Sequence, residues 1–166
     1  MEIRPARPEE FAEAGRVTEE AYEAEGFLVA SDGSYDHDYA AWLRDGAARA
    51  ALATLVVAAD DDSLLGTVMW CPLGSPFREL AKEPEQAEFR TLAVSVATRG
   101  RGVGRALVSY CIDRARAEGH TTVVISSLPS MKNAHRLYES LGFDRRPDLD
   151  WSPKPGVALW GFSYTL

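Results

Sequence analysis

The sequence predicts a single α/β domain built around one mixed β-sheet. The chain has 166 residues, enough for one domain with a full hydrophobic core. Apolar residues recur in short β-branched runs and, elsewhere, at the spacing of amphipathic helices. An apolar strand at residues 88–96 is followed by a helix and then by a second apolar strand at 121–127. Such a crossover joins parallel strands, so we expect one parallel pair inside the sheet.

The first third of the chain predicts a short strand and two helices. Residues 2–4 can form a strand, which the prolines that follow end. At residues 9–25 apolar side chains recur at helical spacing, and a glycine then stops the helix. Residues 27–35 are interpreted as a loop. Asp36 or Asp38 can cap a second helix after it.

The middle of the chain predicts a hairpin and a long connection. The β-branched run at 54–59 and the apolar run at 64–71 are separated by a turn at 60–63, as in two antiparallel strands. Residues 72–86 hold three prolines and are interpreted as a connection. The strand at 88–96 follows directly.

The last third predicts two helices and the remaining strands. A helix at 102–118 has apolar residues on one face. Ser130 can cap a further helix that runs to Leu141, and a glycine ends each of these helices. Strands at 143–146 and 157–166 complete the expected sheet.

The charge distribution argues against nucleic acid as a partner. The net charge is −7, and residues 1–46 alone hold 12 acidic and four basic residues, a net charge of −8. This acidic third favours a cationic partner, or it is the solvated surface of ordinary helices.

Cysteine usage and hydropathy predict a cytoplasmic protein. Cys71 and Cys111 have no close partner, so we expect core positions in a reducing compartment rather than a disulfide. We expect neither a signal peptide nor a membrane span. The three histidines are scattered and give no metal-ligand spacing, so no metal is expected.

The segment Arg99-Gly-Arg-Gly-Val-Gly-Arg105 joins the strand at 88–96 to the helix at 102–118. Glycines at alternate positions let a ligand approach the backbone, and the N–H groups of the loop and the helix N-terminus attract a phosphate. A Walker loop is excluded because no Lys and Ser or Thr follow the last glycine. A dinucleotide fingerprint is excluded because its third glycine would fall on Arg105 or Leu107.

The pattern that remains is R-x-x-G-x-G, and with it the chain resembles the GNAT superfamily of acetyl-CoA-dependent N-acetyltransferases. A second block agrees: Ala134-His-Arg-Leu-Tyr-Glu-Ser-Leu-Gly-Phe143 resembles that family's helix A-x-x-L-Y-x-x-x-G-F. The resemblance covers about residues 54–166. It implies a single domain over residues 1–166 with a mostly antiparallel, six- to seven-stranded sheet, one central parallel pair and helices on both faces.

The resemblance also implies how acetyl-CoA is held. The glycine loop would bind the pyrophosphate through backbone N–H groups of seven residues: Arg99, Gly100, Arg101, Gly102, Val103, Gly104 and Arg105. The strand before the loop would splay from its parallel neighbour. Its main chain at Leu92, Ala93 and Val94 would then pair with the pantetheine arm. A backbone N–H near Val94 would polarise the thioester carbonyl.

Two side chains are candidates for proton transfer. Tyr138 matches the family's frequent general acid, which protonates the leaving thiolate; the alternative is a tyrosine that only packs at the end of its helix. Glu88 stands where some members keep a general base. Strand alternation predicts that it shares a face with Arg90, Leu92 and Val94. The alternative for Glu88 is a structural carboxylate at the strand edge.

We therefore expect an enzyme that acetylates a primary amine by direct attack in a ternary complex. The resemblance implies that the amine enters near residues 22–45, 72–86 and 147–160, with 151–156 forming a lip. The first segment is acidic and aromatic, which suits a primary amine beside an apolar group, although ordinary amphipathic helices give the same pattern. Two alternatives are a non-catalytic acyl-CoA-binding domain of the same fold and a nucleotide-binding module. The resemblance is compatible with a homodimer, and both the oligomeric state and the identity of the amine stay open.

Overall fold

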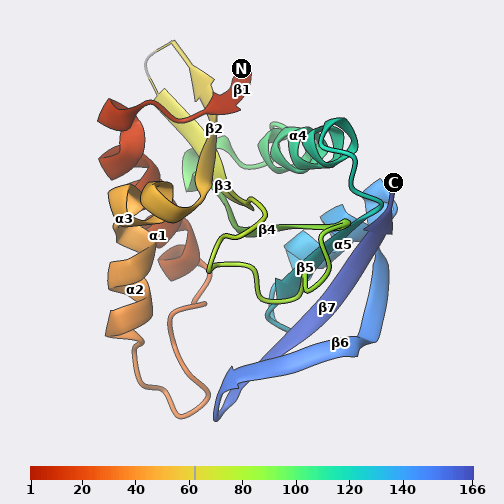
Figure 1. Cartoon of the computed structure of the whole chain (residues 1–166). Helices are drawn as coiled ribbons and strands as arrows, with labels where there is room; N and C mark the ends of the chain where they lie inside the picture. Colours follow the sequence, from red (N-terminus) through yellow and green to blue (C-terminus); the bar gives the residue numbers. More distant parts are fainter. Residues whose placement is uncertain (62) are drawn as a thin grey trace.

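The computed structural model describes residues 1–61 and 63–166 of the chain. Its described residues form a β-sheet between two helical layers (Figure 1). In chain order the elements are β1 (Glu2–Pro5), η1 (Pro8–Glu10, a 3-10 helix), α1 (Phe11–Ala24), α2 (His37–Arg44), α3 (Gly46–Leu52), β2 (Thr54–Asp60), β3 (Ser63–Cys71), β4 (Gln86–Val94), η2 (Val96–Thr98, a 3-10 helix), α4 (Val103–Ala117), β5 (Thr122–Ser127), α5 (Lys132–Leu141), β6 (Asp144–Lys154) and β7 (Val157–Thr165).

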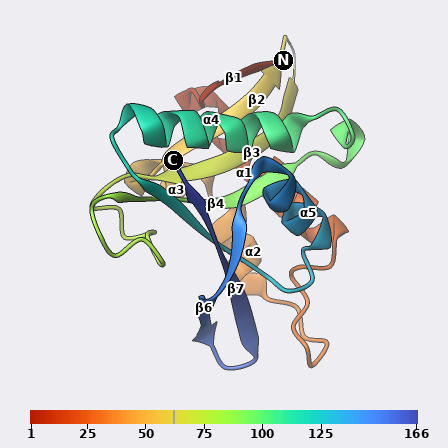
Figure 2. The same ribbon diagram turned by 90° about the vertical axis from the view of Figure 1, so that its right-hand side faces the viewer.

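The sheet confirms the predicted fold class. Its strand order is β1-β2-β3-β4-β5-β7-β6. Neighbouring strands are antiparallel except β4 and β5, the central pair that the crossover through α4 makes parallel. The hairpin of β6 and β7 extends beyond the rest of the sheet (Figure 2).

Helices cover both faces of the sheet, and the hydrophobic core is divided accordingly. Helices α1, α2 and α3 pack on one face and α4 and α5 on the other (Figures 1 and 2). The larger core cluster lies under α4 and α5 and includes Trp70, Phe89, Leu107 and Phe162. Smaller clusters lie between the sheet and α1 and between α1 and α2.

The structure adds one helix to the predicted N-terminal elements. Asp36 caps α2 by accepting a hydrogen bond from the Tyr39 backbone N–H at 3.0 Å. It is one of the two residues predicted as the cap of this helix. Helix α3 was not expected, because it is short and rich in alanine and so gives no amphipathic pattern. A Cβ added to Gly46 would lie 1.9 Å from the Phe11 carbonyl oxygen, so a glycine is needed where α3 meets α1. The predicted turn at 60–63 includes residue 62, which lies outside the described residues; Asp60 and Ser63 on either side are paired.

Three predicted boundaries in the second half are wrong. Strand β4 ends at Val94 rather than residue 96, because the chain turns into η2. Ser130 does not cap α5, which begins at Lys132 after a turn in which the Met131 N–H bonds the Leu128 carbonyl. Strand β6 runs to Lys154 instead of ending at 146. Its prolines are tolerated because β6 is an edge strand and needs no hydrogen bonds on its outer side.

Candidate active site

The two parallel strands at the centre of the sheet separate after a short pairing. β4 and β5 are in register only from Gln86 opposite Thr122 to Glu88 opposite Val124. β5 continues along β7 instead, as far as Ser127. The backbone groups of residues 89–94 that face β5 are therefore left without a neighbouring strand. A cavity of about 610 Å³ opens at this separation.

A β-bulge on β4 sets which side chains face each side of the sheet. The register with β3 shifts between Met69 opposite Arg90 and Thr67 opposite Ala93, and Thr91 has a φ of 53°. Beyond the bulge, Leu92 packs with Phe89 in the cluster under α4. The predicted alternation is thus wrong: Leu92 and Val94 do not share a face with Glu88 and Arg90, because one extra residue reverses the order.

The glycine loop and the start of α4 form one end of the pocket. Gly100 and Gly102 have φ values of 79° and 78°, the left-handed region that favours glycine. Gly102 is the N-cap of α4 and supplies no side-chain cap, so the first N–H groups of this 15-residue helix have no capping side chain. A Cβ on Gly104 would lie 3.2 Å from Leu137, where α4 and α5 come close. This end of the pocket therefore suits a phosphate group.

The three arginines of the loop have different neighbours. Arg99 lines the pocket and forms an ion pair with Glu25 from the end of α1. Arg105 also lines it and donates to Ser140 Oγ at 2.7 Å. Arg101 is not among the pocket residues, because its guanidinium pairs with Asp60 at 3.1 Å. The other nine predicted cofactor-binding residues all line the pocket.

Tyr138 lines the same pocket from α5, with only 5% of its surface exposed. Its ring packs against Phe89, Phe143 and Phe162, with centroids 5.6–6.3 Å apart. Burial raises the pKa of its hydroxyl, with a smaller contribution from Cys111. The phenol is therefore protonated throughout the neutral pH range, as a proton donor must be.

Glu88 is fully buried, but the structure does not bring it to the pocket. Its Oε2 accepts three backbone N–H bonds, from Glu79 at 2.9 Å, Leu80 at 3.0 Å and Ala81 at 2.9 Å. Burial raises the pKa of this carboxyl, and the backbone bonds oppose that shift. These contacts fix the connection between β3 and β4. The contacts support the predicted alternative, in which Glu88 is a structural carboxylate. They leave it without the access to an amine that a general base needs.

The N-terminal third contributes pocket residues from the segment 22–45, which the sequence predicted near the acceptor, and Ala21 just before it. From α1 and the turn after it come Ala21, Tyr22, Glu25 and Phe27. Only Glu25 among the acidic residues of 22–45 lines the cavity. The described charged residues around it are Glu25, Arg90, Arg99, Arg105 and Lys132, so basic side chains prevail. The expected acidic lining is therefore not what the structure places at the pocket.

The other two segments expected around the acceptor lie outside the pocket lining. No residue of 72–86 or 147–160 is among the described lining residues. Trp151 on β6 nevertheless donates to Ser126 Oγ at 3.0 Å, and Ser126 does line the pocket. Lys154 at the hairpin tip pairs with Asp36 at 2.5 Å. The hairpin thus reaches across to the start of α2.

Residues 1–61 and 63–166 contain no group of three or more His, Cys, Asp and Glu side chains placed to hold a metal ion. Within the same residues no helix is long and apolar enough to cross a membrane.

A glycine-rich loop at the start of a helix, a separated parallel pair and a buried tyrosine in one pocket fit a class of α/β protein that binds an extended, phosphate-bearing ligand. A model of the acetyltransferase (GNAT) family matches residues 5–143. The chain belongs to this family. Its fold is therefore the one that the sequence motifs predicted.

Curated relatives and solved structures agree with this assignment. The chain is 29% identical over 104 residues to N-acetyltransferase family 8 member 2 of Rattus norvegicus, covering 61% of this chain and 46% of the relative. It is 32% identical over 76 residues to N-acetylaspartate synthetase of Danio rerio, covering 46% of this chain and 27% of the relative. The matches thus span less than half of the length of these relatives.

Solved structures show the same fold over almost the whole chain. A GCN5-related N-acetyltransferase from Kribbella flavida has a TM-score of 0.69 at 25% identity, covering 99% of this chain and 97% of that one. A putative acetyltransferase from Salmonella typhimurium was solved with its cofactor acetyl-CoA. It has a TM-score of 0.68 at 23% identity, covering 100% of this chain and 94% of that one.

Proposed function

We propose that the protein transfers an acetyl group from acetyl-CoA to a primary amine by direct attack within a ternary complex. One observation carries the proposal: the glycine loop, the separation of β4 and β5, and Tyr138 all belong to one cavity. The residues present fit the co-substrate. The glycine loop and uncapped α4 suit its phosphates, and the unpaired edge of β4 suits the amide groups of an extended arm.

The proposal gives each part of the pocket one task. Acetyl-CoA supplies a thioester, whose carbonyl carbon forms the new bond to nitrogen as the bond to sulfur breaks. Backbone N–H groups of residues 99–105 hold the pyrophosphate, and the main chain of 92–94 aligns the pantetheine arm. An N–H near Val94 stabilises negative charge on the carbonyl oxygen. Tyr138 gives its proton to the departing sulfur and regains one from solvent.

The remaining proton is the one that the amine must lose. Because Glu88 lies outside the pocket lining and binds three backbone N–H groups, the proposal assigns this proton to water. The two cysteines are buried, and burial raises the pKa of Cys71 to about 12 and that of Cys111 further. Neither lines the pocket. Direct transfer is therefore favoured over an acetylated cysteine.

Thermal shift and thiol release test the proposal together. Acetyl-CoA at a hundredfold excess over its Kd should stabilise the protein by about 2.7 kcal/mol. An amine library should then contain acceptors that release free CoA. Stabilisation by NAD or ATP instead of acetyl-CoA would contradict the proposal. Stabilisation by acetyl-CoA without thiol release for any amine would identify a non-catalytic acyl-CoA-binding domain.

A further inference from the structure

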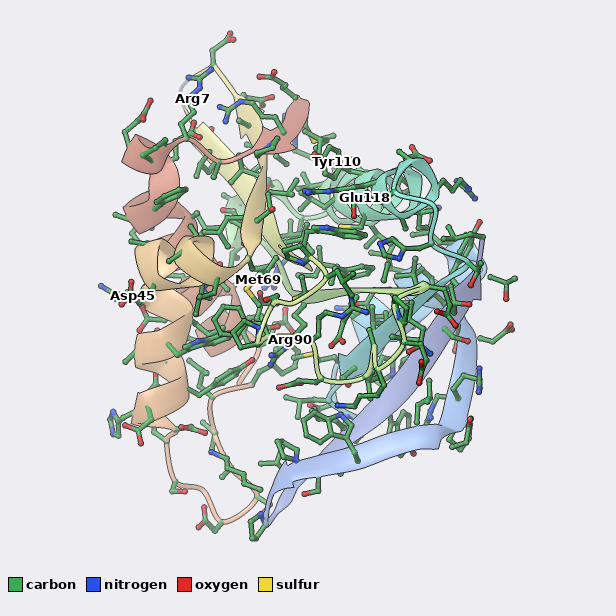
Figure 3. The ribbon with its side chains drawn as sticks, in the orientation of Figure 1. Arg7, Asp45, Met69, Arg90, Tyr110 and Glu118 are labelled. Carbon is green, nitrogen blue, oxygen red and sulfur yellow. The ribbon has the colours of Figure 1, made fainter. Side chains whose placement is uncertain are left out.

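Arg90 presents a free hydrogen-bonding edge beside the pocket. It lies on β4 near the centre of the molecule, between the α1–α3 layer and the connection from β3 to β4 at residues 72–85 (Figure 3). Its Nη1 pairs with Glu79 Oε1 at 3.0 Å and donates to the Phe77 carbonyl at 3.1 Å. Nε and Nη2 have no partner among the described residues, although Arg90 lines the cavity. This Nε–Nη2 edge is one that binds a carboxylate through two parallel hydrogen bonds.

Aromatic side chains surround the guanidinium of Arg90. It lies 5.6 Å from the ring centroid of Trp42 on α2. Tyr39 stacks on Trp42 at 5.6 Å, and Tyr22 meets Tyr39 edge-on at 6.2 Å. Tyr22 lines the pocket with Arg90. A ligand held by Arg90 would therefore have an apolar wall beside it.

A second guanidinium adds positive charge under the same wall. Arg49 is 1% exposed and also lies 5.6 Å from the Trp42 ring. It donates to the Leu43 carbonyl and to Thr18 Oγ1, but its Nε and Nη1 have no partner among the described residues. Burial lowers the pKa of Arg49 to about 10, so the side chain stays charged at neutral pH.

Neither arginine uses all of its N–H groups on the described residues. Glu79 pairs with Arg90, and no described carboxylate pairs with Arg49. Glu88 is already bound to three backbone N–H groups. Burial raises the pKa of both glutamates, and the Arg90 guanidinium opposes that shift in each. The unpaired N–H groups of the two guanidinium groups therefore favour an anion beside Arg90 in the cavity.

We infer that the acceptor is an amine that also carries a carboxylate, as an amino acid does, and that the Nε–Nη2 edge of Arg90 binds this carboxylate. The inference rests on the proposed acetyl transfer and names the substrate class for it. Arg90 is the residue that selects the acceptor. Trp42 and Glu79 hold its side chain in place, and Tyr22 supports the apolar part of the substrate.

Matched pairs of acceptors test the inference by thiol release. L-Phenylalanine is compared with phenethylamine, and L-methionine with 3-(methylthio)propylamine; the members of each pair differ in the carboxylate. We expect kcat/KM to be about tenfold or more higher for the amino acids. Arg90→Gln should abolish most of this advantage by raising KM for the amino acids alone. Arg90→Lys, which keeps the charge but not the paired edge, should give an intermediate ratio.

The controls separate this inference from the proposed function. Arg16→Gln, on the exposed face of α1, should leave every ratio unchanged. Melting temperatures of the Arg90 variants identify any loss of folding, and the ratio within one variant does not depend on how much of it is active. Equal or better turnover of the amines without a carboxylate would overturn the inference while retaining acetyl transfer. An equal effect of Arg90→Gln on both members of a pair would overturn it as well. Thiol release for no acceptor at all would instead contradict the proposed function.

Discussion

Tyr138 is the residue whose proposed role a single atom can test. Replacing it with Phe keeps the packing against Phe89, Phe143 and Phe162 and removes only the hydroxyl. Because that hydroxyl is proposed to protonate the leaving sulfur, we expect kcat to fall about 100-fold. Acetyl-CoA affinity and the melting temperature should stay the same. Steady-state kinetics with a thermal shift measure both, and an unchanged kcat would leave Tyr138 as a packing residue.

Two substitutions of Glu88 separate its hydrogen bonds to the backbone from a role as general base. Glu88→Gln keeps a carbonyl oxygen that can accept the bonds from Glu79, Leu80 and Ala81, so kcat should change less than about threefold. Glu88→Ala leaves those N–H groups unpaired and should cost about 3 kcal/mol of unfolding free energy. A loss of kcat near 100-fold in a stable Gln variant would restore the predicted general base.

The same residue predicts a pH dependence of stability. Burial raises the pKa of Glu88 in the folded chain above its unfolded value. Its contribution is therefore complete below the unfolded pKa, near 4.3, and is lost as pH rises through the folded pKa. Glu88→Gln cannot ionise, so its stability relative to the unmodified chain should increase from pH 4 to pH 8. Denaturant titrations at several pH values measure this difference, and a constant difference would contradict it.

At the scale of elements, a matched pair of glycines can separate the role of the loop before α4 in acetyl-CoA binding from its effect on the stability of the helix. Gly102 and Gly119 flank α4 with φ values of 78° and 80°, and a Cβ at either would meet nothing within 4 Å. Alanine at either position should therefore lower the free energy of unfolding by a similar amount, about 1–2 kcal/mol, because of backbone strain. Only Gly102→Ala should also weaken acetyl-CoA binding, because it distorts the phosphate loop. Equal Kd values for the two variants would argue against phosphate binding there.

Elements with strong periodicity were predictable from the sequence, and short or bent ones were not. The hairpin of β2 and β3, the crossover through α4 and the glycine loop follow from patterns of apolar residues and glycines. Helix α3 escaped prediction because Gly46–Leu52 is mostly alanine. The bulge at Thr91 escaped because no local signal marks a left-handed threonine. That one residue reversed the predicted face of Leu92 and Val94.

The candidate site divides in the same way. The half proposed for acetyl-CoA is made largely by backbone in contiguous segments, and nine of the ten residues expected from the motifs line the pocket. The half proposed for the acceptor is made by side chains from distant segments, such as Tyr22 on α1, Arg90 on β4 and Ser126 on β5. Which of the many acidic residues would face the pocket depended on helix orientation. The sequence pattern allowed either an acidic lining or ordinary amphipathic helices, and the structure places Glu25 and Arg90 at the pocket.

At the scale of the whole molecule, the N-terminal helical layer and the C-terminal hairpin meet at one side of the pocket. Asp36, the cap of α2, pairs with Lys154 at the tip of the β6–β7 hairpin at 2.5 Å, and the two segments come together away from the rest of the sheet (Figure 1). Trp151 ties the same hairpin to Ser126 inside the pocket wall. The hairpin should therefore influence the acceptor and not acetyl-CoA, whose expected loop lies at the other end of the pocket.

Lys154→Met tests this link without disturbing the cap, since Asp36 keeps its bond to the Tyr39 N–H. A partly exposed ion pair contributes up to about 1 kcal/mol, so the acceptor KM should rise at most about fivefold. Amide hydrogen exchange should quicken in residues 28–36 and 151–157, because each segment loses its contact with the other. Arg146→Met is the matched control, because it breaks a pair with Asp148 within β6 itself. It should change neither the acceptor KM nor the amide hydrogen exchange of the two segments. Faster exchange in the hairpin alone, with the acceptor KM unchanged, would mean that the two segments touch without acting together on the substrate.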